Sequence, residues 1–102
     1  MNEIFIKKDI NNKVALKLLK KTGQKCLIVV DEKRRLRGTL SDGDLRNSIL
    51  SGGFKGSIKN FYNKKPIFFY QNNINFAEAK KYFLKENITV IPIINKKNKK
   101  IH

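Results

Sequence analysis

The sequence is poor in the residues that most often carry catalysis or cross-links. It has one cysteine (Cys26), one histidine (His102) and no tryptophan among 102 residues. A single cysteine excludes an intrachain disulfide. Cys26 opens the apolar run CLIVV, and the lone histidine at the far end offers it no nearby catalytic partner. We therefore expect Cys26 to be a small buried core residue.

Long apolar runs are also missing. No stretch approaches the roughly 20 residues that span a bilayer, and the N-terminal MNEIFIKKDI lacks the apolar core of a signal peptide. These absences predict a cytoplasmic protein with no membrane partner. A hydrophobic content of 40% with seven phenylalanines predicts a folded chain of one domain at most, since disordered chains are poorer in such residues.

Acidic residues are scarce: 8 Asp and Glu stand against 23 Lys and Arg, a net charge of +15. Such an excess is the first sign of a nucleic-acid-binding protein. However, the lysines are spread along nearly every segment, outnumber the arginines and come with abundant asparagine and isoleucine, as A/T-biased genomes encode. The densest cluster, NKKNKK at 95–100, fits an exposed hairpin turn. The charge suits small phosphorylated ligands or an acidic partner surface as well as DNA or RNA.

One helical unit occurs twice, at an offset of roughly 64 residues. Residues 12–38 and 75–102 both begin with apolar residues at helical spacing. Gly23 stands where the first helix should stop, and Asn87 stands at the matching place in the second, because both residue types tolerate the left-handed conformation that ends helices. The repeat predicts two similar structural units.

Matching strands surround each helix. The apolar runs 26–30 and 90–94 are typical of buried strands, and polar turns opened by Asp31 and Asn95 follow them. Further strands are expected to begin at Leu36 and Ile101, and short strands at 4–6 and 66–69 are expected to precede the helices.

The first copy continues into SDGDLRNSILSGG (41–53), a second helix with Leu45, Ile49 and Leu50 on one face, whereas the second copy stops at His102. We therefore expect a fragment of a longer protein. The predicted fold class is α+β, with the first repeat at 1–63 and the second, incomplete repeat at 64–102.

This pattern resembles a tandem pair of CBS domains, over nearly the whole chain. The resemblance rests on the two apolar-run-and-turn segments, on IPI at 91–93 and on GTLSDGDLR at 38–46. The family signature, a glycine, then Ser or Thr three residues later, then Asp after three more, falls on Gly38, Ser41 and Asp44. It implies two strand–helix–strand–strand(–helix) repeats packed face to face, the second truncated.

The amino-acid sequence of the motif is similar to that of one subgroup of the CBS family. GTLTDGDIRRAIL is typical of the CBS pair before the catalytic domain of certain bacterial sugar-phosphate nucleotidyltransferases, which make nucleotide sugars for surface glycans. This chain differs by Ser41, Leu45, Asn47 and Ser48. The resemblance implies an attached or associated catalytic domain. These 102 residues contain no nucleotidyltransferase glycine-rich loop or metal-binding aspartates, so we expect a regulatory module without catalytic residues of its own.

The motif GTLSDGDLR allows a structural and a functional interpretation. Ser41 and Asp44 approximate a capping box, and Asp42 and Asp44 would oppose the helix dipole favourably, without any ligand. The same atoms suit a nucleotide, because the Asp44 carboxylate can accept two ribose hydroxyls while free N–H groups and the Ser41 hydroxyl hold a phosphate. Both interpretations stay open at this stage.

The resemblance implies a site for an adenosine-type ligand such as AMP, ADP or ATP, with no cofactor required. Gly38 would let the ligand approach the backbone, and Thr39 and Asp42 are weaker neighbours of the signature residues. Ile91 and Pro92 could form an apolar wall, although Pro92 could equally end ladder pairing at a strand edge. Such pairs usually associate further, so a homodimer is expected.

Other sites are disfavoured. Asp31, Asp42 and Asp44 lack histidine or cysteine support for a metal, and Ser41 lacks a base to act as a nucleophile. FYNKKPIFFY (61–70) mixes lysine with aromatics as nucleic-acid stacking surfaces do, but its alternation favours a linker and a strand. The leading hypothesis is a regulatory adenine-nucleotide-sensing module. The alternatives are a small basic nucleic-acid-binding protein and a ligand-free dimerisation scaffold.

Overall fold

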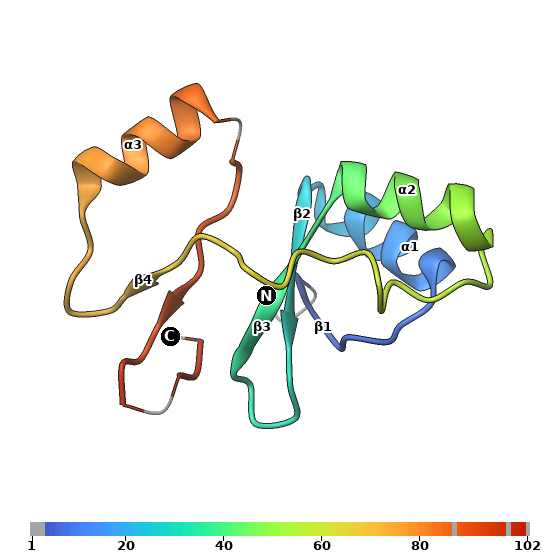
Figure 1. Cartoon of the computed structure of the whole chain (residues 1–102), viewed down its shortest axis with the longest axis horizontal. Helices are drawn as coiled ribbons and strands as arrows, with labels where there is room; N and C mark the ends of the chain where they lie inside the picture. Colours follow the sequence, from blue (N-terminus) through green and yellow to red (C-terminus); the bar gives the residue numbers. More distant parts are fainter. Residues whose placement is uncertain (1–3, 87, 98, 102) are drawn as a thin grey trace.

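A computed structural model describes residues 4–86, 88–97 and 99–101 (Figure 1). It has an α+β fold in which a strand–helix–strand unit occurs twice, as the sequence predicts. The elements in chain order are β1 (Phe5–Ile6), α1 (Asn12–Thr22), β2 (Cys26–Val30), β3 (Leu36–Ser41), α2 (Asp42–Gly52), β4 (Phe69–Tyr70), α3 (Phe76–Lys85) and β5 (Ile93–Ile94).

The first repeat forms a three-stranded sheet of order β1-β2-β3, with β1 parallel and β3 antiparallel to the central β2. Helices α1 and α2 pack together beside it (Figure 1). All five residues of β2 are buried, as predicted for CLIVV, so both faces of this strand are covered. The core cluster joins the sheet to the two helices and consists of Ile6, Ala15, Leu19, Leu27, Val29, Leu40, Leu45 and Ile58.

The second repeat reproduces the first in outline. β4 runs parallel to β5, as β1 does to β2, with a one-residue difference in register. The helices also begin alike. The Asn11 side chain accepts a hydrogen bond from the Val14 N–H at 2.9 Å, and the Asn75 side chain accepts one from the Glu78 N–H at 2.9 Å. Asparagine is among the best residues for this N-terminal capping position, so both copies start their helix by the same device.

The second repeat has shorter strands than predicted. The apolar run 90–94 forms a strand only from Ile93, because Pro92 has no N–H to donate to a ladder. The Pro92 carbonyl still accepts a hydrogen bond from Phe69 N–H at 3.0 Å, which places Pro92 at the start of the pairing. The strand expected at 66–69 is found at Phe69–Tyr70. The helix stop expected at Asn87 lies outside the described residues, as does His102.

Backbone hydrogen bonds join β3 to the connecting segment and to the second repeat. Thr39 and Asn63, the last residue of the predicted first repeat, exchange two hydrogen bonds, with N···O distances of 3.0 and 2.8 Å. Near the other end of the strand, Leu36 N–H donates to the Lys99 carbonyl at 3.3 Å, and Ile101 N–H donates to the Arg34 carbonyl at 3.1 Å. The second repeat is therefore attached at the β3 edge of the first-repeat sheet rather than to its helices.

Helix α3 makes little use of its apolar face. It has no buried residue, and it stands apart from the other helices at the upper left of Figure 1. Phe76, Phe83 and Leu84 on this helix are exposed. Within the described residues no helix is long and apolar enough to cross a membrane.

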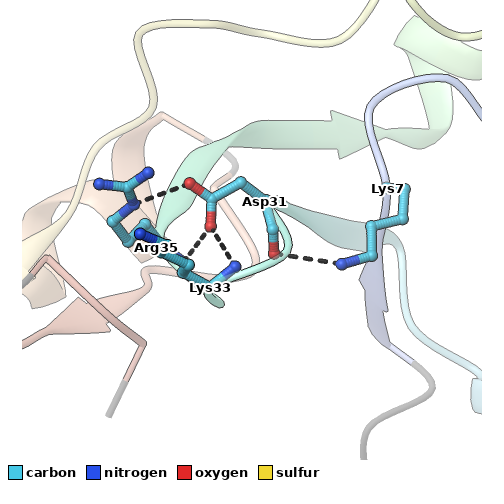
Figure 2. A network of polar contacts seen from close by, with 4 residues as sticks. All are labelled: Lys7, Asp31, Lys33 and Arg35. Carbon is cyan, nitrogen blue, oxygen red and sulfur yellow. Dashed lines mark hydrogen bonds and ion pairs between the residues drawn. The ribbon is translucent and has the colours of Figure 1, made fainter.

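The predicted polar turns are present in both repeats. The Asp31 carboxylate accepts hydrogen bonds from the backbone N–H groups of Lys33 and Arg35, each at 2.9 Å, and from Arg35 Nε at 2.8 Å (Figure 2). Lys7 Nζ donates to the Asp31 carbonyl at 3.2 Å, tying β1 to the same turn. Asn95 repeats the arrangement, since its side chain accepts a hydrogen bond from Lys97 N–H at 2.8 Å.

The Asp31 turn predicts a specific acid sensitivity. Hydrogen bonds led by the Arg35 backbone N–H lower the pKa of Asp31 from 3.8 to about 2. Because the folded pKa is depressed, the carboxylate stabilises the fold above about pH 4, and this contribution is lost as the pH falls through about 2. We expect Asp31→Asn to lower the melting temperature at neutral pH and to flatten its decline between those two pH values.

Thermal unfolding followed by circular dichroism across this pH range measures the effect. Glu32→Gln, at the neighbouring exposed position, is the matched control and should keep the wild-type acid profile. An Asp31→Asn protein whose melting temperature falls with acid as steeply as the wild type contradicts this role of the turn.

Candidate functional site

The GTLSDGDLR segment forms the end of β3 and the start of α2. Ser41 is the N-cap, and its hydroxyl oxygen accepts a hydrogen bond from Asp44 N–H at 3.1 Å. In return, Asp44 Oδ2 accepts a hydrogen bond from Ser41 N–H at 3.0 Å. This confirms the predicted capping box, with Asp in place of the usual Glu or Gln. The box fixes the position of the Asp44 side chain at the helix start.

A cleft of about 480 Å³ opens beside this helix start, and we call it the Asp44 cleft. Its lining comes from both repeats and from the segment between them. The first repeat supplies polar groups near the β3–α2 junction, and the second repeat supplies mainly apolar groups before β5. The lining residues are Cys26, Thr39, Ser41, Asp44, Asn63, Ile67, Ile88, Thr89 and Val90.

Three of the predicted site residues, Thr39, Ser41 and Asp44, come together in this cleft. Gly38 and Asp42 do not line it. Asp42 is exposed at the first position of α2, where it favourably opposes the helix dipole. The motif thus contributes both to the cleft wall and to the start of the helix.

Gly38 is buried beneath the segment that connects the repeats. A Cβ atom added there would overlap the Asn63 carbonyl oxygen and lie 2.7 Å from the Tyr62 ring. The absence of a side chain therefore lets the connecting segment approach β3. A direct ligand contact by Gly38 stays a prediction.

The apolar wall of the cleft comes from residues next to those predicted. Ile91 and Pro92 do not line the cleft; Pro92 is buried at the start of the β4–β5 pairing. Ile67, Ile88 and Val90 supply apolar surface instead. The sequence contains a signal for Val90, because the offset of 64 residues that relates Asn11 to Asn75 also relates Cys26 to Val90.

Cys26 is buried, as predicted, but it also lines the cleft. Burial, and secondarily the nearby Asp44 charge, raise the pKa of the Cys26 thiol from 9.0 to about 11. The thiol is therefore protonated at neutral pH, and a protonated thiol is a poor nucleophile. Cys26 contributes shape and a low-polarity surface to the cleft.

The Asp44 cleft can bind a diol against an apolar wall. Asp44 Oδ2 already accepts the Ser41 N–H, whereas Oδ1 accepts no hydrogen bond from the described residues. A carboxylate has about four lone-pair sites, so acceptor capacity for two hydroxyl groups remains. Thr39 and Ser41 add hydroxyl groups. Among the described residues no three His, Cys, Asp or Glu side chains gather in a metal-binding arrangement.

Comparison with known proteins decides the family. Residues 1–51, half of the chain, match the CBS domain family. The chain belongs to the CBS domain family. Inosine-5′-monophosphate dehydrogenase from Aquifex aeolicus (strain VF5) is 31% identical over 99 residues, which cover 97% of this chain and 20% of the relative. The CBS chain thus spans about a fifth of that enzyme, which is a dehydrogenase and not a sugar-phosphate nucleotidyltransferase.

Solved structures confirm the predicted CBS-pair fold. CBSX2 in complex with AMP superposes with a TM-score of 0.75 at 21% identity, covering 95% of this chain and 76% of that chain. The cytosolic domain of the Mg²⁺ channel MgtE in complex with ATP superposes with a TM-score of 0.74 at 20% identity, covering 95% and 39%. The protein is a CBS regulatory module, of a kind whose solved members include adenine-nucleotide complexes.

Proposed function

We propose that this CBS pair is a regulatory module that binds an adenine nucleotide in the Asp44 cleft. The observation that carries the proposal is the composition of the cleft. The first repeat places a carboxylate with spare acceptor capacity at one side, and the second repeat places Ile88 and Val90 in the same cleft. A nucleoside needs both a partner for its ribose hydroxyls and a low-polarity surface for its base.

Each part of the ligand has a matching group. Asp44 accepts the 2′ and 3′ hydroxyls, while Ile67, Ile88 and Val90 contact the base. The Ser41 hydroxyl and the Gly43 N–H at the start of α2 suit a phosphate oxygen, because the first N–H groups of a helix lack intrahelical partners. The Asp42 and Asp44 N–H groups, by contrast, already donate to the Lys25 carbonyl and the Ser41 hydroxyl. The net charge of +15 adds a general attraction for phosphates. The AMP complex of CBSX2 and the ATP complex of MgtE support adenine as the base.

Regulation follows from the shared lining of the cleft. Because both repeats contribute to the site, its affinity depends on how they are arranged, and a ligand shifts an equilibrium only through unequal affinity for its states. We propose that the repeats divide at residues 1–63 and 64–102, and that the ligand-dependent arrangement is read by an attached or associated enzyme in the cytoplasm.

Two kinds of enzyme are candidates for this role. The amino-acid sequence of the GTLSDGDLR motif supports a sugar-phosphate nucleotidyltransferase of nucleotide-sugar synthesis as the regulated enzyme. The Aquifex relative supports an IMP dehydrogenase instead. The exposed Phe76, Phe83 and Leu84 of α3 support association into a homodimer, since exposed apolar side chains grouped on one element often contact a partner.

Thermal unfolding with and without nucleotides tests the proposal. We expect AMP, ADP or ATP to raise the melting temperature, by roughly 10 °C or more at a hundredfold excess over Kd. Single-stranded oligonucleotides should have little effect at physiological salt. A nucleic-acid-binding protein would show the reverse, with steep salt dependence. A ligand-free scaffold would respond to neither, and either outcome contradicts the proposal.

A further inference from the structure

A second cleft, of about 490 Å³, lies at the opposite end of β3 from Ser41 and faces β4 and β5. We call it the Phe68 cleft. It shares no lining residue with the Asp44 cleft. Its walls come from the start of β3, from the segment that leads into β4, and from the turn after β5. The lining residues are Leu36, Arg37, Lys64, Lys65, Pro66, Phe68, Tyr70, Ile94 and Lys99.

The charged groups of this cleft all have one sign. Arg37, Lys64, Lys65 and Lys99 line it, and no Asp or Glu does. None of these four cations forms an ion pair with a carboxylate of the described residues, whereas the nearby Arg35 is paired with Asp31 at 2.8 Å. Four cations that share one concave surface raise the local concentration of anions.

Two aromatic rings form part of the same wall. Phe68 and Tyr70 meet edge to face, with ring centroids 5.4 Å apart and an interplanar angle of 83°. Lys99 Nζ donates a hydrogen bond to the Tyr70 hydroxyl at 3.2 Å and lies 4.9 Å from the centroid of that ring. Tyr70 is thereby held in place, while the Phe68 side chain remains 37% exposed and can stack on a planar group.

A further basic hollow among the described residues is less suited to an anion. It measures about 420 Å³ and surrounds the Asp31 turn, where Lys7 and Arg35 already contact Asp31. Asp9 and Glu32 also line it. Three carboxylates in that hollow offset its positive charge, so the acid-free Phe68 cleft is the stronger candidate.

We propose that the Phe68 cleft is a second ligand site, which takes a nucleoside triphosphate with its base against Phe68 and its phosphates among the four cations. Lysine and arginine donate charge-assisted hydrogen bonds to phosphate, and an exposed aromatic ring stacks on a base. The volume lies in the range of small-molecule sites, about 300–1,000 Å³, and suits a mononucleotide rather than a strand. This site goes beyond the proposed function, which concerns only the Asp44 cleft.

Isothermal titration calorimetry with ATP tests the site in an Asp44→Ala background, where the Asp44 cleft is disabled. We expect one ATP bound per chain. Should this variant unfold, the wild type is titrated instead, and two ATP are expected per chain. Adding Lys64→Gln and Lys65→Gln should weaken ATP binding about tenfold or more, because two charge-assisted contacts are lost.

The matched control is Lys80→Gln with Lys81→Gln, which removes the same charge from adjacent exposed lysines of α3 that line neither cleft. It should leave ATP affinity within about twofold. Phe68→Leu should weaken ATP about tenfold through lost stacking, while leaving the affinity for inorganic tripolyphosphate unchanged.

Three results would overturn this site: no ATP bound by the Asp44→Ala protein (or a single ATP bound by the wild type, if that variant unfolds), equal affinities in the two lysine pairs, or an oligonucleotide that binds more tightly than ATP. Failure of the proposed function is seen separately, as a wild-type protein that binds no AMP in the Asp44 cleft.

Discussion

Replacing Gly38 by alanine lowers the melting temperature by roughly 10–20 °C, corresponding to a loss of about 3 kcal/mol. The added Cβ would overlap the Asn63 carbonyl oxygen and press on the Tyr62 ring. The contact atom is backbone, which cannot rotate away as the end of a side chain can. The connecting segment must move, and the two hydrogen bonds between Thr39 and Asn63 are strained or broken.

Gly43→Ala is the control for this substitution, because it adds the same methyl group five residues away in the same motif. Its Cβ would meet only the Ser41 hydroxyl at 3.9 Å, an ordinary contact. Since alanine favours helix over glycine by about 1 kcal/mol, Gly43→Ala should be neutral or stabilising. Chemical denaturation of the three proteins measures the difference. Equal stability of Gly38→Ala and the wild type would show that the connecting segment does not need the close approach.

Replacing Asp44 by alanine weakens AMP binding at least about 100-fold, because two charge-assisted hydrogen bonds to the ribose are lost. The carboxylate is held by Ser41 N–H at 3.0 Å through one oxygen, so the ligand meets an acceptor that is already oriented. The same substitution removes half of the capping box and costs roughly 1 kcal/mol of stability. Calorimetric titration with AMP measures the affinity independently of this loss.

Two further variants separate the ligand contact from the cap. Asp42→Ala removes the same charge from the first turn of α2, but Asp42 does not line the cleft, so AMP affinity should stay within about twofold. Asp44→Asn keeps one acceptor oxygen and should bind AMP about tenfold more weakly than the wild type. Equal losses in Asp42→Ala and Asp44→Ala would attribute the effect to general charge and remove Asp44 from the site.

The helix ends, the buried strand and the capping box were predictable because each depends on residues that are neighbours in sequence. Gly23 has a φ of 69° at the end of α1, where the helix stop was expected. CLIVV forms the fully buried β2, and Ser41 with Asp44 forms the expected capping box. The internal repeat also predicted the second strand–helix–strand unit. Glycine, capping residues and apolar runs act within one turn or strand, so their consequences can be derived from the sequence.

The composition of the Asp44 cleft was only partly predictable, because it is set by contacts between distant segments. Thr39, Ser41 and Asp44 belong to one motif and were identified together. Ile88 and Val90 directly precede the predicted Ile91 and Pro92, and which of these residues line the cleft depends on where Pro92 shortens β5. The close packing of Gly38 against Asn63 likewise depends on how the connecting segment returns over β3, which no local pattern specifies.

A nuclear magnetic resonance titration of the ¹⁵N-labelled protein with AMP tests most directly whether the two repeats build one nucleotide site. Binding in the Asp44 cleft should shift the amide signals of Thr39, Ser41 and Asp44 together with those of Thr89 and Val90, in one saturable process. Shifts confined to a single repeat, or no shifts in these residues, would show that the cleft between the repeats is not the nucleotide site.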